Sequence, residues 1–257
     1  MAAEGPPAVI AESNFPPYAY GLLQAAALAK RLGVSALAAA ELGVATGNGL
    51  LELERLAGVL GAAHGLRIDT IGFDTGVGMP APVDHRDMPY IWREGFFRMD
   101  EAALRSRLQR STLLLGDVAE TAPEVVAGDW PPIGFLAFDL DYYSATSAAM
   151  RALLLGPPER YLPRVFCYFD DTVGPHEEYH SPFTGELLAI DEFNAAHAMR
   201  KIARINGLRY KLLPLEAPWV EGIYVLHLFD HPRYADYVFP EVSRQFPLER
   251  QHRRPVQ

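Results

Sequence analysis

Two short apolar segments of the sequence each end in a pair of aspartates. The run FLAFDLD contains Asp139 and Asp141, and the run VFCYFDD ends in Asp170 and Asp171. Ionised carboxylates directly after strand-like hydrophobic segments lower stability unless a cation meets them there. If the two runs are neighbouring parallel strands, their ends lie about 5 Å apart, and one metal ion can take ligands from both. We therefore predict a divalent metal, Mg²⁺ or another such cation, held by Asp139, Asp170 and Asp171.

Asp141 and two histidines are the other groups near the predicted metal. Asp141 follows the strand end, and capping the helix that begins at Ser144, or orienting the ligands, suits it better than direct coordination. The proton acceptor can be Asp139 while it coordinates the metal, or a histidine, and we take Asp139 as the candidate catalytic residue. His176 and His180, in the loop GPHEEYH, are the histidines in reach, with a solvated surface role as their alternative.

A glycine-rich segment, ELGVATGNG, joins the apolar run 36–42 to residues with helical spacing. Its glycines, Gly43, Gly47 and Gly49, let a ligand approach the backbone while the helix N-terminus faces it. The spacing G-x-x-x-G-x-G is not the G-x-G-x-x-G of dinucleotide binders. Glu41, two residues before the first glycine, is poorly suited to a pyrophosphate and well suited to a cation such as a sulfonium. We expect Glu41, Gly43 and Gly47 to bind a cofactor, a tight turn without a ligand being the alternative.

Two more acids follow predicted strands. Asp74 ends the strand 68–73, where a carboxylate can accept both hydroxyls of a ribose, as in other nucleotide-binding folds. Asp117 follows the strand 112–115 and can meet an adenine amino group. Because Glu41, Asp74 and Asp117 occupy successive strand ends, they indicate a nucleoside-containing cofactor more strongly together than any one of them does.

The elements that must position these acids alternate between helix and strand. Helical spacing covers residues 17–33, the segment after the glycine turn, and residues 185–206. Near-continuous apolar strands between such helices predict an α/β fold with a parallel sheet covered on both faces. The expected strands are 36–42, 68–73, 112–115, 133–138 and 165–169, followed by two late ones around Tyr210–Leu213 and Ile223–Phe229.

A single domain accounts for the whole chain, 1–257, because no internal repeat or low-complexity linker divides it. Within it we expect an N-terminal helical segment, 1–35, and a basic tail, 250–257. The stretch 79–98 is long for a loop and carries Trp92 with several other aromatics and prolines, so we expect an ordered lid or pocket wall. A local hydrophobic cluster or a dimer contact is the alternative for this loop.

The composition favours some kinds of binding partner over others. The chain has 257 residues and a formal net charge of −9, which disfavours a nucleic-acid partner and favours a small or neutral substrate. No apolar run reaches the roughly 18 residues of a membrane span, and the N-terminus has no signal-peptide pattern. Cys167 is the single cysteine, so no intrachain disulfide can form. We expect a cytoplasmic protein without a membrane partner, and a homo-oligomer remains open.

The motifs, taken together, resemble a known family. The run ELGVATGNG is similar to the first motif of class I S-adenosylmethionine-dependent methyltransferases, with Ala45 where many members carry glycine. The run FDTGVGMP resembles the Asp-Ser-Phe-x-Gly-Leu-Pro segment of the macrocin O-methyltransferase family, and DLDYYSAT resembles its Asp-x-Asp-x-Tyr-x-x-Thr segment. The pair Asp170-Asp171 and the run AIDEFNAAH (189–197) match that family as well.

This resemblance implies a Rossmann-like seven-stranded methyltransferase sheet, parallel except for a reversed last strand, with helices on both faces. It implies S-adenosylmethionine as cofactor and a magnesium-dependent methylation of a hydroxyl on a small molecule, in that family often a sugar of a natural product. Leu140 replaces a small residue of the family pattern, and the loop 79–98 has no counterpart in it. The acceptor is therefore not given by the resemblance.

Other functions use a similar glycine turn. A short-chain NAD(P) dehydrogenase needs a Tyr-x-x-x-Lys pair, and Tyr142, Tyr143 and Tyr161 have no lysine four residues on. A non-catalytic S-adenosylmethionine-binding protein or partner subunit, in which the acids merely cap helices, is the main alternative. A third is the same fold with another reaction near the sulfonium, such as hydroxylation.

Overall fold

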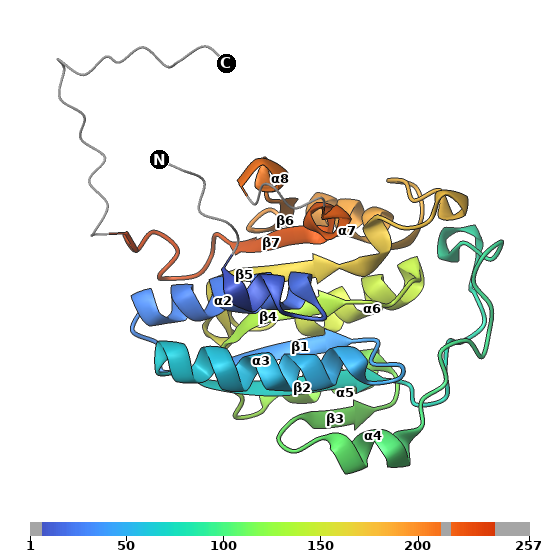
Figure 1. Cartoon of the computed structure of the whole chain (residues 1–257). Helices are drawn as coiled ribbons and strands as arrows, with labels where there is room; N and C mark the ends of the chain where they lie inside the picture. The colour runs from blue at the N-terminus through green and yellow to red at the C-terminus, as the bar shows by residue number, and fades with distance from the viewer. Residues whose placement is uncertain (1–6, 212–216, 240–257) are drawn as a thin grey trace, which may run out of the picture.

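The computed structural model describes residues 7–211 and 217–239, and within them seven strands form one sheet (Figure 1). The strand order is β3-β2-β1-β4-β5-β7-β6. Every neighbouring pair is parallel except those that involve β7, which runs antiparallel to both β5 and β6. This confirms the predicted Rossmann-like sheet with one reversed strand. The strands are β1 (Ala36–Leu42), β2 (Arg67–Asp74), β3 (Thr112–Leu115), β4 (Ile133–Phe138), β5 (Tyr161–Phe169), β6 (Arg200–Arg204) and β7 (Ile223–Leu228).

Helices cover both faces of the sheet, α2 and α3 on one face and α5, α6 and α7 on the other (Figure 1). The sequence of β1 is largely apolar because its alternate residues point to opposite faces of the sheet and both faces are buried. Leu37 and Ala39 belong to the core beneath α2 and α3, whereas Ala38 and Ala40 belong to the core on the opposite face. The described helices are α1 (Ala8–Ala11), α2 (Pro16–Arg31), α3 (Asn48–His64), α4 (Glu101–Arg107), α5 (Val118–Ala127), α6 (Tyr143–Leu153), α7 (Gly185–Ala196) and α8 (Leu208–Lys211).

The C-terminal elements differ from the sequence prediction. The predicted helix 185–206 ends at Ala196, and its last part forms the strand β6. The strand predicted around Tyr210–Leu213 is wrong, because Leu208–Lys211 is helical and residues 212 and 213 lie outside the described part of the chain. The side chain of Asn194 connects α7 to β6. It accepts a hydrogen bond from the Ile202 N–H (2.7 Å) and donates one to the Ile202 carbonyl (2.8 Å). Local spacing cannot reveal such a contact.

The two ends of the chain are described only in part. The predicted N-terminal segment 1–35 supplies α1 and α2, apart from residues 1–6, and the predicted tail 250–257 lies outside the described residues. None of the described helices combines the length and the apolar character that crossing a membrane requires.

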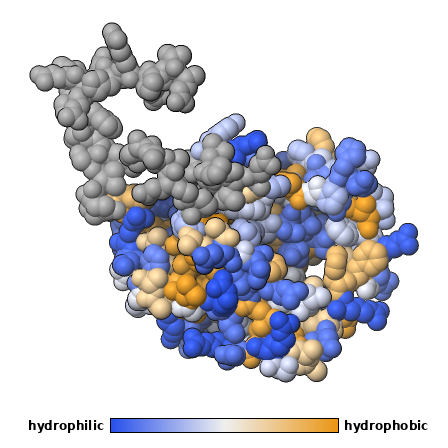
Figure 2. All heavy atoms as spheres, viewed as in Figure 1, coloured by the Kyte–Doolittle hydropathy of each residue, from blue (hydrophilic) through white to orange (hydrophobic). Residues whose placement is uncertain are grey.

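Figure 2 shows the surface of the face that is seen in Figure 1. Hydrophilic and hydrophobic side chains are interspersed over its coloured part, rather than gathered in one continuous apolar area.

Candidate active site

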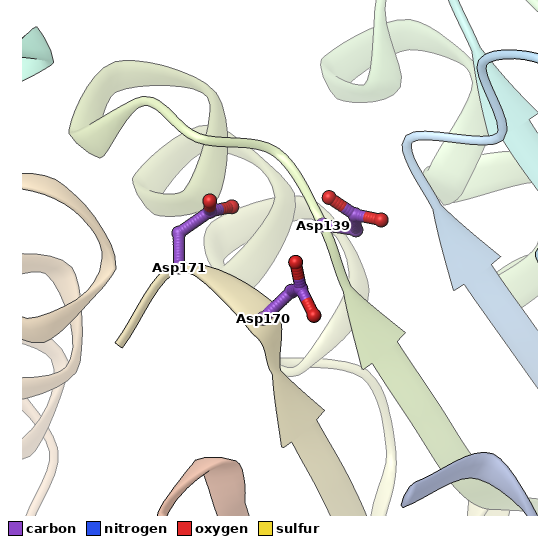
Figure 3. A group of neighbouring side chains, drawn as sticks. All are labelled: Asp139, Asp170 and Asp171. Carbon is purple, nitrogen blue, oxygen red and sulfur yellow. The ribbon is translucent and has the colours of Figure 1, made fainter. Parts of the chain in front are cut away.

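The two predicted pairs of aspartates meet at one edge of the sheet. β4 and β5 are neighbours in register, with Phe138 opposite Phe169 and their rings stacked at a centroid distance of 4.6 Å. The residues that follow are therefore brought side by side. Asp139, Asp170 and Asp171 each offer a carboxylate oxygen, and these oxygens lie within 4.8 Å of one another (Figure 3). The spacing is that of a group able to share one cation, and metal binding by these three residues stays a prediction.

Carboxylates at this distance oppose each other's ionisation. Burial, with Asp170 as the strongest neighbouring charge, raises the pKa of Asp139 well above its usual value. Burial likewise raises the pKa of Asp171, with Glu186 as its strongest neighbouring charge. A bound cation would reverse both effects, because it stabilises the ionised form of every carboxylate around it.

Asp141 does not cap the helix that follows it. α6 begins at Tyr143, and its free N-terminal groups are met by Asp87, whose two oxygens accept hydrogen bonds from the Ser144 N–H and the Ser144 hydroxyl, both at 2.8 Å. Asp141 instead has a left-handed backbone, φ 59°, and its N–H donates to Asp171 Oδ2 at 2.8 Å. Of the two roles expected for Asp141, the cap is absent and the orienting role stays a prediction. Burial raises the pKa of its own carboxyl to about 7.

Glu186 is an acid of this site that the sequence did not indicate. It lies in the first turn of α7, where an acid ordinarily needs no explanation beyond the helix dipole. Its side chain is nevertheless fully buried, and Oε2 accepts a hydrogen bond from the Asp171 N–H at 3.1 Å. No described group bonds to Oε1, although that atom is buried too.

The predicted cofactor acids lie at the ends of the next strands along the same edge. Asp74 accepts hydrogen bonds from the Ala45 N–H (2.8 Å) and the Gly76 N–H (2.7 Å), so that it joins the glycine turn to the turn after β2. Asp117 caps α5 by accepting from the Ala119 N–H at 2.8 Å. Both acids line the cavity described below, and each carboxylate keeps lone pairs for a ligand.

The glycines of the turn have packing reasons of their own. Gly43 has φ 89°, and a Cβ there would lie 1.8 Å from the Asp139 carbonyl oxygen, so glycine is what lets the ends of β1 and β4 approach. Gly47 has φ 87° and precedes α3, where a Cβ would collide with Leu104. Gly43 lines the cavity, whereas Gly47 does not. Close packing and a left-handed backbone therefore account for Gly47 without a ligand, and the cofactor contacts of Gly43 and Gly47 stay predictions.

Glu41 lies beneath the turn and not on the cavity wall. Its side chain is buried, Oε1 accepts a hydrogen bond from the Tyr18 hydroxyl at 2.7 Å, and Oε2 has no partner among the described residues. The expected direct approach of a cationic ligand to Glu41 has no counterpart in the lining residues. Burial raises its pKa to about 8.

Glu41 makes stability depend on pH in a predictable direction. Its pKa is about 8 when folded, against 4.5 for the free side chain, so its contribution is fully present below about pH 4.5 and is lost as the pH rises through 8. We expect Glu41→Gln, which keeps an oxygen for Tyr18, to gain stability relative to the wild type across that window. Urea unfolding at several pH values in EDTA measures the free energy of unfolding of both proteins. The contributions of the other buried acids are the same in both and cancel in the difference. Parallel stability curves for the two proteins would contradict the prediction.

One cavity of about 730 Å³ connects the two groups of acids. Asp74 and Asp117 line one part of it, and the aspartates of β4 and β5 line another. The loop 79–98 supplies a mostly apolar wall, which includes Met79, Pro80, Trp92 and Phe97.

The loop 79–98 is fastened to the fold behind that wall. Asp87 is buried and binds the Val83 N–H at 2.8 Å in addition to Ser144, and the Tyr142 hydroxyl donates to the Pro80 carbonyl at 3.1 Å. Residues of this loop thus line the cavity, and its role as a lid or pocket wall stays a prediction.

The histidines predicted as alternative bases do not line the cavity. His180 instead contacts Glu178, with 2.7 Å between Nε2 and Oε2, and Glu178 does line the cavity. His176 contacts the ring of Tyr179. The residues around the cavity include seven Asp or Glu side chains and, in the described part of the chain, no Lys, Arg or His.

Comparisons with known proteins give the fold a wider context. No protein family model matches the chain, and no curated protein is significantly similar to it. Among solved structures, the calicheamicin methyltransferase CalS11 has a TM-score of 0.53 and 23% identity, with 85% of this chain and 88% of that chain covered. The O-methyltransferase NovP has a TM-score of 0.55 and 15% identity, with 82% and 80% covered. At these identities the likeness establishes a shared Rossmann-like methyltransferase fold.

Proposed function

We propose that the chain is an S-adenosylmethionine-dependent O-methyltransferase that uses a divalent cation, Mg²⁺ or a similar ion, to activate a hydroxyl of a small molecule. The observation that carries this proposal is that two sets of strand-end acids share one cavity. Asp74 and Asp117 suit a nucleoside, and the cluster of Asp139, Asp170 and Asp171 suits a metal. The two solved structures of similar fold are described as methyltransferases, which supports the same chemistry.

The acid cluster fits a divalent cation by two independent features. Its three carboxylates supply the oxygen ligands that Mg²⁺ prefers and leave positions open for water or for a substrate oxygen. The buried, unpartnered Oε1 of Glu186 beside Asp171 indicates that a group outside the chain completes the site. When bound, the cation would lower the pKa of the acceptor hydroxyl and polarise it.

The chain's own residues align the reactants. Methyl transfer from a sulfonium is an in-line displacement, so the acceptor oxygen must be held in line with the methyl group. Asp139 lies where the two halves meet, because its backbone carbonyl packs against Gly43 of the glycine turn while its carboxylate belongs to the acid cluster. Asp139 is therefore the proposed proton acceptor. The wall formed by the loop 79–98 would exclude water from the reacting groups.

The charge of the cavity restricts the acceptor. Seven acids and no basic side chain line the cavity in the described residues, so a phosphate or carboxylate on the acceptor would find no cationic side chain there to pair with. A cationic cofactor and a divalent metal would offset part of that negative charge. The acceptor is accordingly a neutral or cationic hydroxyl compound, such as a sugar or another natural product, with an apolar part that meets Trp92 and Phe97.

Calorimetry and product analysis test the proposal together. S-adenosylmethionine should bind the purified protein, and a panel of neutral sugars and phenolic natural products should yield a methyl ether only when Mg²⁺ or Mn²⁺ is present. Cofactor binding without any metal binding would favour a non-catalytic binder or partner subunit. Equal methylation in EDTA would contradict the metal part of the proposal.

Asp74→Asn is expected to weaken S-adenosylmethionine binding by about 1–3 kcal/mol, the usual effect of losing a charge-assisted hydrogen bond. The amide nitrogen cannot accept a hydrogen bond, so the bond to Ala45 or the bond to Gly76 is lost, together with any ribose hydroxyl held by the same atom. Titration calorimetry measures the change. Asp69→Asn, near the other end of β2, is the matched control and should leave the dissociation constant unchanged. An unchanged constant in Asp74→Asn would place the cofactor elsewhere.

A further inference from the structure

Glu186 is connected to Asp171 and, through it, to Asp141 by hydrogen bonds between side chains and backbone N–H groups. Its Oε2 accepts the Asp171 N–H, and Asp171 Oδ2 in turn accepts the Asp141 N–H at 2.8 Å. This chain of hydrogen bonds runs from the first turn of α7, through the residue after β5, to the segment between β4 and α6. Asp171 is thereby held at two points: Glu186 binds its backbone N–H, and the Asp141 N–H binds its carboxylate.

The second oxygen of Glu186 has no partner. The side chain is fully buried, Oε1 accepts no hydrogen bond, and no ion pair reaches Glu186 within the part of the chain that the structure describes. The charges that surround it are those of Asp139, Asp170 and Asp141, all of the same sign. Such an arrangement lowers stability unless a donor or a cation arrives, because buried acceptors and unpaired charges are costly.

Glu186 itself does not belong to the group of carboxylates whose oxygens lie within 4.8 Å of one another. Direct coordination of a cation is thus left to Asp139, Asp170 and Asp171. Mg²⁺ usually keeps some of its waters, and acceptors around the ligands commonly bind and orient these waters. An unpartnered carboxylate oxygen next to a ligand is suited to that role.

We propose that Glu186 is a positioning residue of the metal centre: Oε2 fixes Asp171, and Oε1 accepts a hydrogen bond from a water on the cation. The inference rests on the metal part of the proposed function. It adds a further acidic residue, from α7, that neither the strand-end pattern nor the resemblance assigns.

Mn²⁺ is the probe for this role, because its binding and the number of its waters can be followed by electron paramagnetic resonance and water-proton relaxation. Glu186→Gln should weaken Mn²⁺ binding about 10–100-fold, the range for loss of a group that orients a metal ligand. Its S-adenosylmethionine affinity should be unchanged, and the relaxation of water protons by the bound ion should differ from that of the wild type.

Glu52→Gln is the matched control. Glu52 is also buried, but it lies in α3 on the other face of the sheet, where Ser13 and Arg55 satisfy it. Its replacement should lower stability without changing Mn²⁺ affinity. Glu186→Asp, which keeps the carboxylate on a shorter side chain, should bind Mn²⁺ with intermediate affinity.

Thermal unfolding separates positioning from a purely structural role. In EDTA, Glu186→Gln should be at least as stable as the wild type, because the amide keeps an oxygen for the Asp171 N–H and leaves no carboxyl buried beside the aspartates. Added Mn²⁺ should raise its melting temperature less. Wild-type Mn²⁺ affinity in Glu186→Gln, or marked destabilisation of this variant in EDTA, would overturn the assignment while leaving the proposed function intact. A wild-type protein that binds no Mn²⁺ would overturn both.

Discussion

Asparagine in place of Asp139 or Asp171 is expected to abolish methyl transfer while largely preserving the affinity for S-adenosylmethionine. The two functions separate because the metal cluster occupies the ends of β4 and β5, whereas Asp74 and Asp117 occupy the ends of β2 and β3. A metal that polarises the acceptor supplies several kcal/mol of transition-state stabilisation, so its loss corresponds to a decrease of about 10³-fold or more in kcat.

Initial rates and cofactor titrations on the same preparations check this separation. Asp129→Asn is the matched control, since Asp129 is exposed and precedes β4 at the opposite end of the strand from Asp139. It should leave both rate and affinity unchanged. Chelation of the wild type should reproduce the loss of rate, and Mg²⁺ should restore it. A parallel fall in rate and cofactor affinity in the Asp139 and Asp171 variants would refute the separate roles.

The strand ends could be predicted from the sequence because the signal for them is local. β1, β3 and β4 begin and end where the apolar runs do. β2 and β5 contain all of their predicted residues and are longer than predicted. Parallel strands place the residues after their carboxyl ends on one edge, so acids that follow such runs must gather there. The meeting of Asp139 with Asp170 and Asp171 needed no further information than this.

Contacts between distant segments could not be predicted in this way. Asp87 caps α6 from a loop 57 positions away in the sequence, and Glu186 reaches Asp171 from a helix whose apolar spacing says nothing of its first turn. The sequence predicts a ligand contact for Glu41 because this residue precedes the glycines. The structure directs it toward Tyr18 instead, since Glu41 lies with Leu37 and Ala39 on the face of β1 that α2 and α3 cover.

The late strands show the same limit. The sequence of β6, RKIAR, contains residues that also form helices well, and only pairing with β7 decides its conformation. Arg200 illustrates the reason: its guanidinium binds the Leu154 and Gly156 carbonyls and pairs with Asp230 at 3.0 Å. All of these partners are at least 30 residues away along the chain.

Gly43→Ala is expected to lower the free energy of unfolding by about 2–5 kcal/mol, from roughly 1–2 kcal/mol for the left-handed backbone and 1–3 kcal/mol for overpacking. The φ of Gly43 is 89°, and the added Cβ would lie 1.8 Å from the Asp139 carbonyl oxygen. This carbonyl cannot yield easily, because the Asp139 N–H is bonded to the Leu42 carbonyl at 2.9 Å and the Gly43 N–H to the Phe73 carbonyl at 2.8 Å. The ends of β1 and β4 would have to separate.

Such a separation should impair both halves of the site at once, which distinguishes Gly43→Ala from every variant of a single acid. The turn that Asp74 holds and the strand end that carries Asp139 would move apart, so we expect weaker binding of S-adenosylmethionine and of Mn²⁺ in one protein. Gly58→Ala is the control: Gly58 is exposed within α3 with open space around its missing Cβ, and alanine should add about 0.5–1 kcal/mol there. Urea unfolding and the two titrations give the comparison. If Gly43→Ala lost stability but bound both ligands as the wild type does, the glycine would serve packing alone, and the cofactor half and the metal half of the site would not be joined through this contact.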